Sequence, residues 1–421
     1  MNNNATDNGG GVYNLNGFVN IDVCNVTSNF AMDNGGGLDA KHGSYNIKNS
    51  LINSNTGKDG AGVYVHFGNV KLLSSTVSSN AGEYGAGLCC EDGDINLTDT
   101  SIVGNVASLN AGGTYNINGS VNINNCDFTN NTANSNGGGL DTRHGNSTIV
   151  NSRFSDNKAN YGGGAYNRDG FVAFDRCNFI NNHASVDGGG FCCDDHNLDT
   201  ITNTNFTGNS ATSKGGGVDN ENGELKIDNS SFTRNTASDG GAIKNQNSQG
   251  VDELDIIDST FSGNVASFRG GAIYNDKDSS MSIKGSTLNN NSILDSNSGD
   301  NGGAIFNGEG DLNIIDSTFK NNVAKPGNGY YGQHGCGGAI DNFGGNLIVA
   351  NSVFSDNHAR FGGAINSYYA YLKLVNCQIT DNIADSVGGG VCSNAGIQDI
   401  DTQTKSNFSS NKPNDIFHFN S

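Results

Sequence analysis

The chain has 421 residues, with 22 basic and 42 acidic side chains and a formal net charge of −20. This balance excludes nucleic acid and an anionic membrane surface as the main partner, because both require a basic face. No stretch approaches the roughly 18 uninterrupted apolar residues of a membrane-spanning helix, so we expect no direct insertion into a membrane.

The chain opens with Met1 and five polar or small residues, 2–6, that lead directly into the first repeat. They lack the charged segment and the apolar stretch that mark a signal peptide. From these residues we expect a processed fragment, an unusual export route or a chain that stays inside the cell.

Two short motifs alternate from residue 8 to about residue 411. The first is Gly-Gly-(Gly/Ala)-hydrophobic, as at 35–38 and 270–273, and the second is hydrophobic-x-x-Asn, as at 154–157 and 261–264. The hydrophobic residue of the first motif recurs fifteen times, most often at steps of 25 to 27 residues. A fixed period of this size indicates one segment stacked on itself many times.

Each repeat contains three short segments that are typical of β-strands. The first carries the glycine motif, the second alternates apolar and polar residues, as at 225–227, and the third carries Ser-x-Phe, as at 230–232. Alternation places the apolar residues of a strand on one face. The sequence therefore predicts an all-β fold. We expect a single-stranded, right-handed parallel β-helix over residues 1–411, with about fifteen coils of ~25 residues and three strands per coil, followed by a short tail at 412–421.

Two side-chain ladders are expected inside this β-helix. The Asn of the second motif is present in all fifteen coils, and stacked amides can bond their neighbours above and below. Four of the ten cysteines occupy a position that elsewhere holds Ser or Thr, so we expect small, mostly reduced structural thiols. These cysteines are Cys24, Cys126, Cys177 and Cys377.

A longer period relates residues 9–110 to residues 111–213, at an offset of 102 or 103 residues, which is four coils. His42 in Leu-Asp-Ala-Lys-His-Gly corresponds to His144 in Leu-Asp-Thr-Arg-His-Gly. The pattern is explained by duplication of a four-coil block. It is also explained by a binding unit presented twice, roughly 19 Å apart at the usual strand spacing.

The coils between 240 and 340 are irregular, with extra residues at about 246–253, 292–301 and 325–336. Insertions in repeat arrays commonly carry the binding surface, and exposed tyrosines give rigid contact area for sugars or protein. Together with His42 and His144, the candidate ligand surface comprises Tyr330, Tyr331, His334, Tyr368, Tyr369 and Tyr371.

With both motifs laid out, the chain resembles the passenger region of chlamydial polymorphic membrane proteins and related adhesin-like β-helix proteins. Gly-Gly-Ala-Ile occurs verbatim five times, and Phe-x-x-Asn occurs nine times in alternating phase. The resemblance covers residues 8 to about 411. It implies a non-catalytic adhesin, displayed at the cell surface or secreted, that binds a protein or glycan of a host or neighbouring cell.

A polysaccharide lyase or glycoside hydrolase is the first alternative, because parallel β-helices also carry such enzymes on one lateral face. The residues that would converge there are Asp141, Arg143, His144, Asp169, Asp194 and Asp195. A structural spike or filament is the second alternative, since uncapped sheet ends invite end-to-end association.

Metal sites and cofactors are not expected. The acidic cysteine-containing segments 89–94 and 192–196 come nearest to a metal site. Adjacent cysteines point to opposite strand faces, and no Cys-x-x-Cys spacing brings two thiolates onto one ion.

Overall fold

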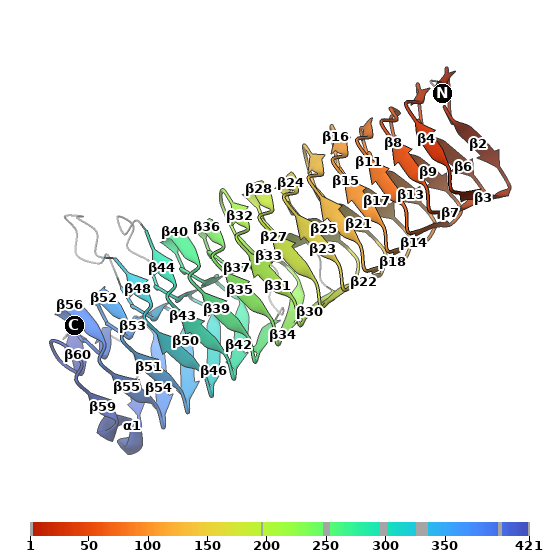
Figure 1. Cartoon of the computed structure of the whole chain (residues 1–421). Coiled ribbons are helices and arrows are strands. Elements are labelled where there is room, and N and C mark those ends of the chain that lie inside the picture. Colours follow the sequence, from red (N-terminus) through yellow and green to blue (C-terminus); the bar gives the residue numbers. More distant parts are fainter. Residues whose placement is uncertain are drawn as a thin grey trace. The chain divides into compact units, whose positions relative to one another are not determined.

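The computed structural model describes residues 3–194, 197–246, 253–294, 301–325, 336–394 and 398–419. The chain divides into two compact units, residues 1–205 and 206–421, and each is a parallel β-solenoid (Figure 1). A regular turn passes through four strands, which belong to four sheets. We label these sheets B, C, D and A in the order in which the chain visits them after the glycines.

Sheets B and C of the first unit are built from successive turns paired in parallel. The strands of sheet B are β2 (Val12–Leu15), β6 (Leu38–Lys41), β9 (Val63–His66), β13 (Leu88–Glu91), β17 (Thr114–Ile117), β21 (Leu140–Arg143), β25 (Ala165–Arg168) and β29 (Phe191–Asp194). The strands of sheet C are β3 (Phe18–Asp22), β7 (Ser44–Lys48), β10 (Val70–Leu73), β14 (Ile95–Thr98), β18 (Val121–Asn124), β22 (Ser147–Val150), β26 (Val172–Asp175) and β30 (Leu198–Thr202).

Sheets D and A of the first unit have shorter strands. Sheet D contains β4 (Asn25–Thr27), β8 (Leu51–Asn53), β11 (Thr76–Ser78), β15 (Ser101–Val103), β19 (Asp127–Thr129), β23 (Arg153–Ser155) and β27 (Asn178–Ile180). Sheet A contains β12 (Ala81–Gly82), β16 (Val106–Ala107), β20 (Thr132–Ala133), β24 (Lys158–Tyr161) and β28 (His183–Asp187), and β1 (Asn4–Ala5) pairs separately with β5 (Phe30–Ala31). The strand β31 (Asn205–Thr207) contains the boundary between the units.

The second unit repeats this plan. Its sheet B contains β33 (Val218–Glu221), β37 (Ile243–Gln246), β41 (Ile273–Asn275), β45 (Ile305–Gly308), β49 (Ile340–Phe343), β53 (Ile365–Tyr368), β57 (Val391–Asn394) and β60 (Ile416–Phe419). Sheet C contains β34 (Glu224–Asp228), β38 (Glu253–Ile257), β42 (Ser280–Lys284), β46 (Asp311–Ile315), β50 (Asn346–Ala350), β54 (Tyr371–Val375) and β58 (Gln398–Ile400).

The remaining elements of the second unit complete its turns. Sheet D contains β35 (Ser231–Thr233), β39 (Thr260–Ser262), β43 (Thr287–Asn289), β47 (Thr318–Lys320), β51 (Val353–Ser355), β55 (Gln378–Thr380) and β59 (Phe408–Ser409). Sheet A contains β32 (Ser210–Ala211), β36 (Thr236–Asp239), β40 (Val265–Arg269), β44 (Ser292–Ile293), β48 (Val323–Ala324), β52 (His358–Phe361) and β56 (Ile383–Val387). A short helix, α1 (Thr402–Ser406), lies between β58 and β59 and is capped by the Asp401 side chain. In the described residues no helix has the length and apolar character needed to cross a membrane.

The expected three strands per coil were wrong, because the segment between the Asn ladder and the glycines forms a fourth. In β16 this segment is only two residues long, too short to show alternation in the sequence. Its backbone nevertheless pairs in register with the turns on both sides, at Ala81 with Val106 and at Val106 with Thr132. The expected tail also contributes a strand, since β60 pairs in parallel with β57.

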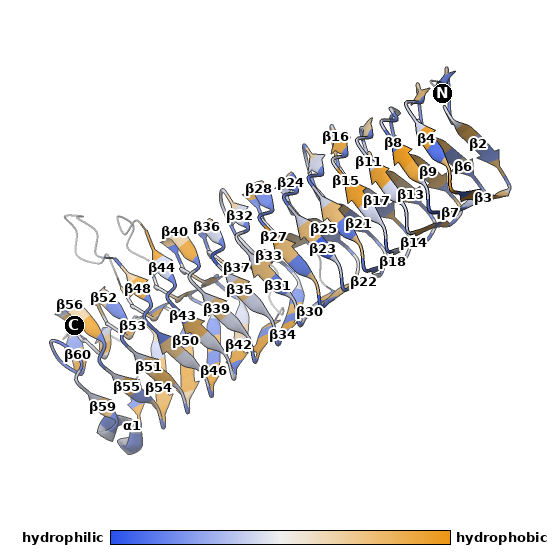
Figure 2. Cartoon of the chain, in the orientation of Figure 1, coloured by the Kyte–Doolittle hydropathy of each residue, from blue (hydrophilic) through white to orange (hydrophobic). Residues whose placement is uncertain are grey.

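The core of each unit is made by the inward residue of every strand, stacked turn on turn. Figure 2 shows apolar strands separated by polar corners. Phe154 is fully buried, with its ring stacked on Phe128 at 4.7 Å and on Phe179 at 4.8 Å between centroids. The corner between Phe128 and Phe154 requires glycine, because Gly137 has φ +61° and a Cβ on Gly138 would collide with the carbonyl oxygen of Gly163.

The predicted Asn ladder is confirmed. In the first unit, the Asn105 side chain accepts hydrogen bonds from the backbone N (3.0 Å) and Nδ2 (2.9 Å) of Asn80. It donates to the Asn131 Oδ1 and to the Val77 carbonyl oxygen, both at 3.0 Å. Each buried amide therefore satisfies polar groups of the turns on either side.

The cysteines at Ser/Thr positions act as members of a second ladder. The Cys126 backbone N donates to the Ser152 hydroxyl at 3.1 Å, and its own Sγ donates to the Asn124 carbonyl at 3.2 Å. Ser152 makes the same contact with the Val150 carbonyl at 2.8 Å. All ten cysteines are free thiols, and Cys24 alone among them is exposed.

Candidate functional site

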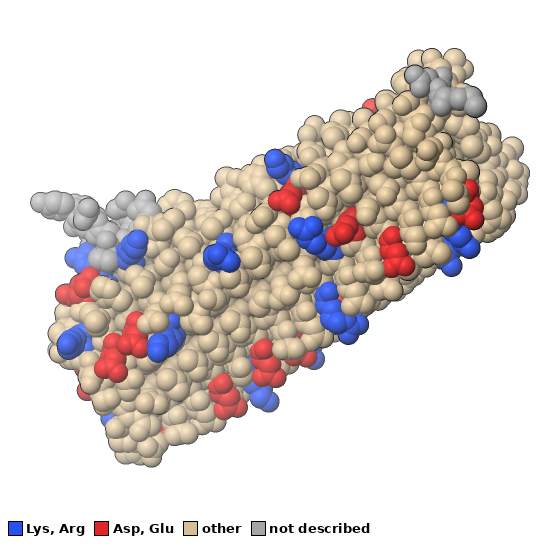
Figure 3. Space-filling view, in the orientation of Figure 1, with Lys and Arg blue, Asp and Glu red and all other residues tan. Residues whose placement is uncertain are grey.

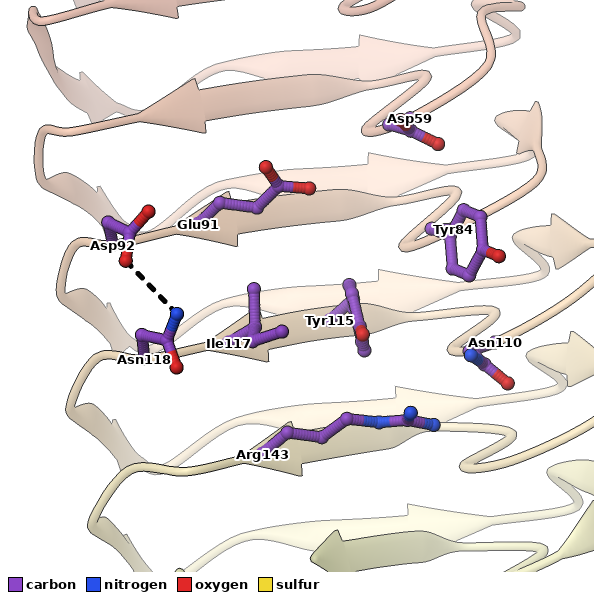
Figure 4. Close-up of a pocket in the computed structure, with 9 residues that line it drawn as sticks. All are labelled: Asp59, Tyr84, Glu91, Asp92, Asn110, Tyr115, Ile117, Asn118 and Arg143. Carbon is purple, nitrogen blue, oxygen red and sulfur yellow. Dashed lines mark hydrogen bonds between the residues drawn. The ribbon is translucent and has the colours of Figure 1, made fainter.

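The outer face of sheet B in the first unit carries an open groove that spans four successive turns. Strand alternation points Leu88 and Cys90 of β13 into the core, and Cys89 and Glu91 away from it. Cys89 is nevertheless buried, because the residues just before the glycines form a lip over this face. Asp59 and Tyr84 belong to the lip and are paired to each other by a parallel β-bridge. The sheet face is thus the floor of the groove, and the lip is one wall (Figure 4).

This groove is an open cavity of about 400 Å³. Nine residues from four successive turns line it: Asp59, Tyr84, Glu91, Asp92, Asn110, Tyr115, Ile117, Asn118 and Arg143. In Figure 4 the Glu91, Ile117 and Arg143 side chains rise from β13, β17 and β21, opposite the lip residues. The lining combines an aromatic ring and an aliphatic side chain with amide, carboxylate and guanidinium groups, which suits a polar organic ligand that has apolar faces.

The floor of the groove has a two-turn period. Tyr64, Tyr115 and Tyr166 occupy the same column of sheet B at intervals of 51 residues, and each is at least 93% buried. Tyr64, Tyr115 and Cys89 pack in one cluster, against which Tyr84 and Ile117 are placed. Two strand spacings separate successive tyrosines by roughly 9.5 Å along the groove. The floor therefore alternates buried tyrosines with Cys89 and Asp141, and the lining residues stand on it.

Arg143 is held rigidly at one end of the cavity. Its Nε and Nη2 donate to both carboxylate oxygens of Asp141, at 3.0 and 2.9 Å. The guanidinium carbon lies 5.5 Å from the Tyr115 ring centroid and 5.7 Å from that of Tyr166. Burial raises the pKa of Asp141, and the hydrogen bonds from Arg143 oppose this shift. Arg143 keeps its positive charge, because its bonds to Asp141 raise its own pKa against the effect of burial.

The acidic side of the cavity is formed by Asp59 and Glu91. Burial raises the pKa of Asp59 to about 6, and the negative charge of Glu91 adds to this shift. The Tyr64 hydroxyl donates to Glu91 Oε2 at 3.0 Å. At neutral pH the cavity therefore presents a fixed cation and two acceptor groups at defined positions.

His42 and His144, the duplicated pair, occupy equivalent corners between sheets B and C, each with φ 55°. Their surroundings differ. The His42 ring stacks on Phe67 at 5.1 Å between centroids, whereas His144 Nδ1 lies 3.5 Å from Asp169 Oδ2. Neither histidine lines the cavity, although Arg143 precedes His144 directly.

The tyrosines near residue 370 lie in the second unit. Tyr368 stacks on Phe343 at 5.9 Å between centroids and meets Tyr369 edge-on at 4.3 Å. Tyr369 is 58% exposed at a corner, with φ 50°. Tyr371 lines a separate open cavity of about 480 Å³ on sheet C. The other lining residues of this cavity are Glu253, Ser280, Met281, Ser282, Asp311, Leu312, Asn313, Asn346 and Ile348.

Several predicted positions fall outside the described residues. Tyr330, Tyr331 and His334 do so, and so do Asp195 and His196.

Of the proposed catalytic set, Asp141 accepts a hydrogen bond from Arg143, while the Tyr166 hydroxyl lies 3.4 Å from Asp194 Oδ2. Within the ranges that the structure covers, no group of three or more His, Cys, Asp or Glu side chains could hold a metal ion.

Sequence reasoning missed the lip residues Asp59, Tyr84 and Asn110. Each stands immediately before the glycine motif, and this column has no shared residue type from turn to turn. A usable signal was the column of tyrosines at 64, 115 and 166, which marks an outward position that still carries large rings.

Comparison with known families gives one match. The chain contains the Chlamydia polymorphic membrane protein repeat, matched at residues 125–143, 229–246 and 258–276. This confirms the resemblance seen in the two tetrapeptide motifs. Proteins with this repeat form a surface-associated, autotransporter-type family that is generally non-catalytic. No curated protein sequence matches the chain.

Proposed function

We propose that this chain, which carries polymorphic membrane protein repeats, is a non-catalytic adhesin module displayed at a cell surface or secreted. Its ligand is a glycan or protein of a host or neighbouring cell, and a glycan chain fits the groove of the first unit best. The observation that carries this proposal is the cavity on sheet B, where polar groups of fixed geometry surround an apolar floor.

The groove favours an extended and weakly charged ligand. The cavity is lined by residues of four successive turns, so an extended polysaccharide lying across these turns would contact several of them at once. Half-buried Tyr84 and Ile117 offer apolar area to sugar rings, while exposed Asn118 and half-buried Arg143 can bond hydroxyl groups. On the face shown in Figure 3, acidic and basic side chains are scattered among many uncharged ones. The cavity itself has three carboxyl groups, of Asp59, Glu91 and Asp92, beside the single guanidinium of Arg143, which favours a neutral polysaccharide over a polyanion.

The test is a glycan array together with a cell-binding screen, with reducing-end release measured in the same wells. We expect binding without release, reduced at least tenfold by Tyr84→Ala and unchanged by Tyr371→Ala. Tyr371 serves as the matched control because it lines the other cavity. Binding that survives Tyr84→Ala and is lost in Tyr371→Ala would move the site to sheet C of the second unit. Binding that is indifferent to both substitutions would overturn the proposal.

A carbohydrate-active enzyme is the second candidate, and a specific observation favours it. Asp59 and Glu91 line the same cavity, and the raised pKa of Asp59, about 6, suits a proton donor. Sugar release that is abolished by Asp59→Asn and by Glu91→Gln would establish this candidate in place of the adhesin.

The third candidate, a spike or filament segment, draws support from the first turn of the first unit. Leu15, Phe18 and Val23 are 56%, 66% and 78% exposed there. A second copy stacked on this turn would cover them. Concentration-dependent growth in light scattering, lost in Phe18→Ser, would support end-to-end association.

We also infer that the coils are right-handed, because crossovers between parallel strands almost always take that hand. An experimental structure would decide the hand directly.

A further inference from the structure

A lysine is buried on the floor of sheet B in the second unit. Lys244 is the second residue of β37, and its side chain is 1% exposed. In the register of the sheet, Lys244 lies between Asp219 of β33 and Tyr274 of β41. A lysine almost never loses this much contact with water unless its ammonium group has specific partners.

The partners of Lys244 come from one neighbouring turn. Its Nζ contacts Oδ2 of Asp276 and lies 3.6 Å from the centroid of the Tyr274 ring. Asp276 follows directly after β41, so the two side chains are brought together across two adjacent turns. The Asp276 side chain is 29% exposed, which leaves a path by which a small molecule such as water can leave.

The second oxygen of Asp276 is held by two donors. Oδ1 accepts a hydrogen bond from the Tyr274 hydroxyl at 2.7 Å and from the Lys277 backbone N at 2.8 Å. Two donors on one carboxyl oxygen withdraw electrons from Cγ and stabilise negative charge that develops on that oxygen. They also fix the orientation of the carboxyl group, with Oδ2 toward the amine.

Further contacts hold Tyr274 in place. Arg269 Nη1 donates to the Tyr274 hydroxyl at 2.9 Å. Arg269 is itself anchored by Asp239, whose two carboxylate oxygens accept from Nε and Nη2 at 3.0 and 2.8 Å. The two donors to Asp276 are therefore positioned before any reaction begins.

Burial also prepares the amine. It lowers the pKa of Lys244, while the negative charge of Asp276 opposes this effect. The negative charge of Asp219 also acts to raise the pKa of Lys244. Burial acts to raise the pKa of Asp276, but the charge of Lys244 and the hydrogen bonds to the carboxylate lower it, so the resting pair is ionic. Proton transfer from the ammonium to the carboxylate gives the neutral amine and the neutral carboxylic acid that can react.

We propose that Lys244 and Asp276 condense to an intramolecular isopeptide bond. The ammonium transfers one proton to Oδ2, and the neutral Nζ attacks Cγ of Asp276. Negative charge collects on Oδ1, where Tyr274 and the Lys277 backbone N stabilise it. A second proton then passes from Nζ to Oδ2, with which Nζ is in contact, the C–Oδ2 bond breaks, and Oδ2 leaves as water. One N–C bond forms, one C–O bond breaks, one water is released, and no oxidant or reductant is needed.

The bond would clamp two turns of the second unit together. It would close a covalent loop from residue 244 to residue 276 and limit the freedom of the unfolded chain, as other cross-links do. A surface-displayed solenoid is held only by non-covalent contacts between turns, so such a link would resist unravelling under force. The inference does not depend on which ligand the first unit binds.

Intact mass spectrometry of the purified full chain tests the proposal. We expect a mass below the sequence mass by one water molecule, and a branched tryptic peptide joining the segments around Lys244 and Asp276. Lys244→Arg and Asp276→Ala should restore the full mass. Asp276→Asn should give the same branched peptide by losing ammonia in place of water. Tyr274→Phe, which removes one donor to Oδ1, should lower the linked fraction.

Lys277→Arg is the matched control, because Lys277 is exposed, pairs with Glu309 at 3.1 Å and contributes only its backbone N to the site. Its mass deficit should equal that of the parent. The full sequence mass in folded parent protein, with no branched peptide, would overturn the proposal. A water deficit that persists in Lys244→Arg would overturn it as well, since that loss would come from cyclisation of an aspartate or asparagine with its own backbone.

Discussion

Substitution of Asn105 by alanine measures how much one member of the Asn ladder contributes to stability. The Asn105 side chain makes four hydrogen bonds, two from Asn80, one to Asn131 and one to the Val77 carbonyl. All these groups are buried, and no water can replace the lost partner without opening the corner. At about 1 kcal/mol of net stabilisation per bond, Asn105→Ala should lower the free energy of unfolding by about 4 kcal/mol.

The assay is urea unfolding followed by far-ultraviolet circular dichroism, with hydrogen exchange to locate the effect. Asn122→Ala is the control, because Asn122 is an exposed strand residue in β18, in the turn that follows. It should change the unfolding free energy by less than about 0.5 kcal/mol. The backbone amide of Asn80 should exchange faster in Asn105→Ala, because it loses Asn105 Oδ1 as its acceptor, whereas the backbone amide of residue 105 keeps Asn131 Oδ1. A loss below about 1 kcal/mol for Asn105→Ala would refute the reasoning that the ladder supports the corner.

Three further predictions follow from buried side chains. Phe154→Ala removes a ring stacked on both sides and should cost about 3–5 kcal/mol in urea unfolding, whereas a loss under 1 kcal/mol would contradict the stacking. The unfolding free energy of Cys126→Ser should stay within about 1 kcal/mol of the parent value, since serine fits the hydroxyl ladder. Cys126→Leu should lower the unfolding free energy by about 1–3 kcal/mol through overpacking. Equal stabilities of the Ser and Leu variants would contradict the ladder. Burial raises the pKa of Asp39 from 3.8 to about 7, so the folded state keeps a proton that the unfolded state loses, and stability falls as the pH rises from about 4 to 7. The unfolding free energy of Asp39→Asn minus that of the parent should therefore be larger at about pH 8 than at about pH 5. An equal difference at these two pH values would refute this.

Much of the solenoid could be predicted because its determinants are local and repeated. Asn105, Cys126 and Phe154 each stand at a position that recurs every turn, and stacking identical positions leaves few alternatives for the groups they satisfy. The fourth sheet could not be predicted in this way. Strands such as β16 contain two residues, and only pairing with adjacent turns makes them strands.

The candidate site was predicted less completely, for a related reason. His144 and Tyr371 were found as residue types with binding chemistry, and the structure places them beside or within open surface features. Tyr84 and Asp59 were missed, because their importance comes from the lip that they form over sheet B. Whether the residues before the glycines cover sheet B depends on the direction in which the backbone turns at that corner. Single residues in the sequence do not reveal this direction.

The sequence by itself determined that this protein is a stacked parallel β-solenoid carrying polymorphic membrane protein repeats, and it identified the ladders that hold the turns in register. Only the tertiary structure decided which outward residues are buried. Arg143 lies over the ring of Tyr115 from the preceding turn, and Lys244 meets Asp276, 32 positions further along the chain, from the next turn. The physical reason is that turn-on-turn stacking brings distant segments to a fixed spacing, so the chemistry of the floor arises from neighbours in space whose partnership the linear order does not reveal.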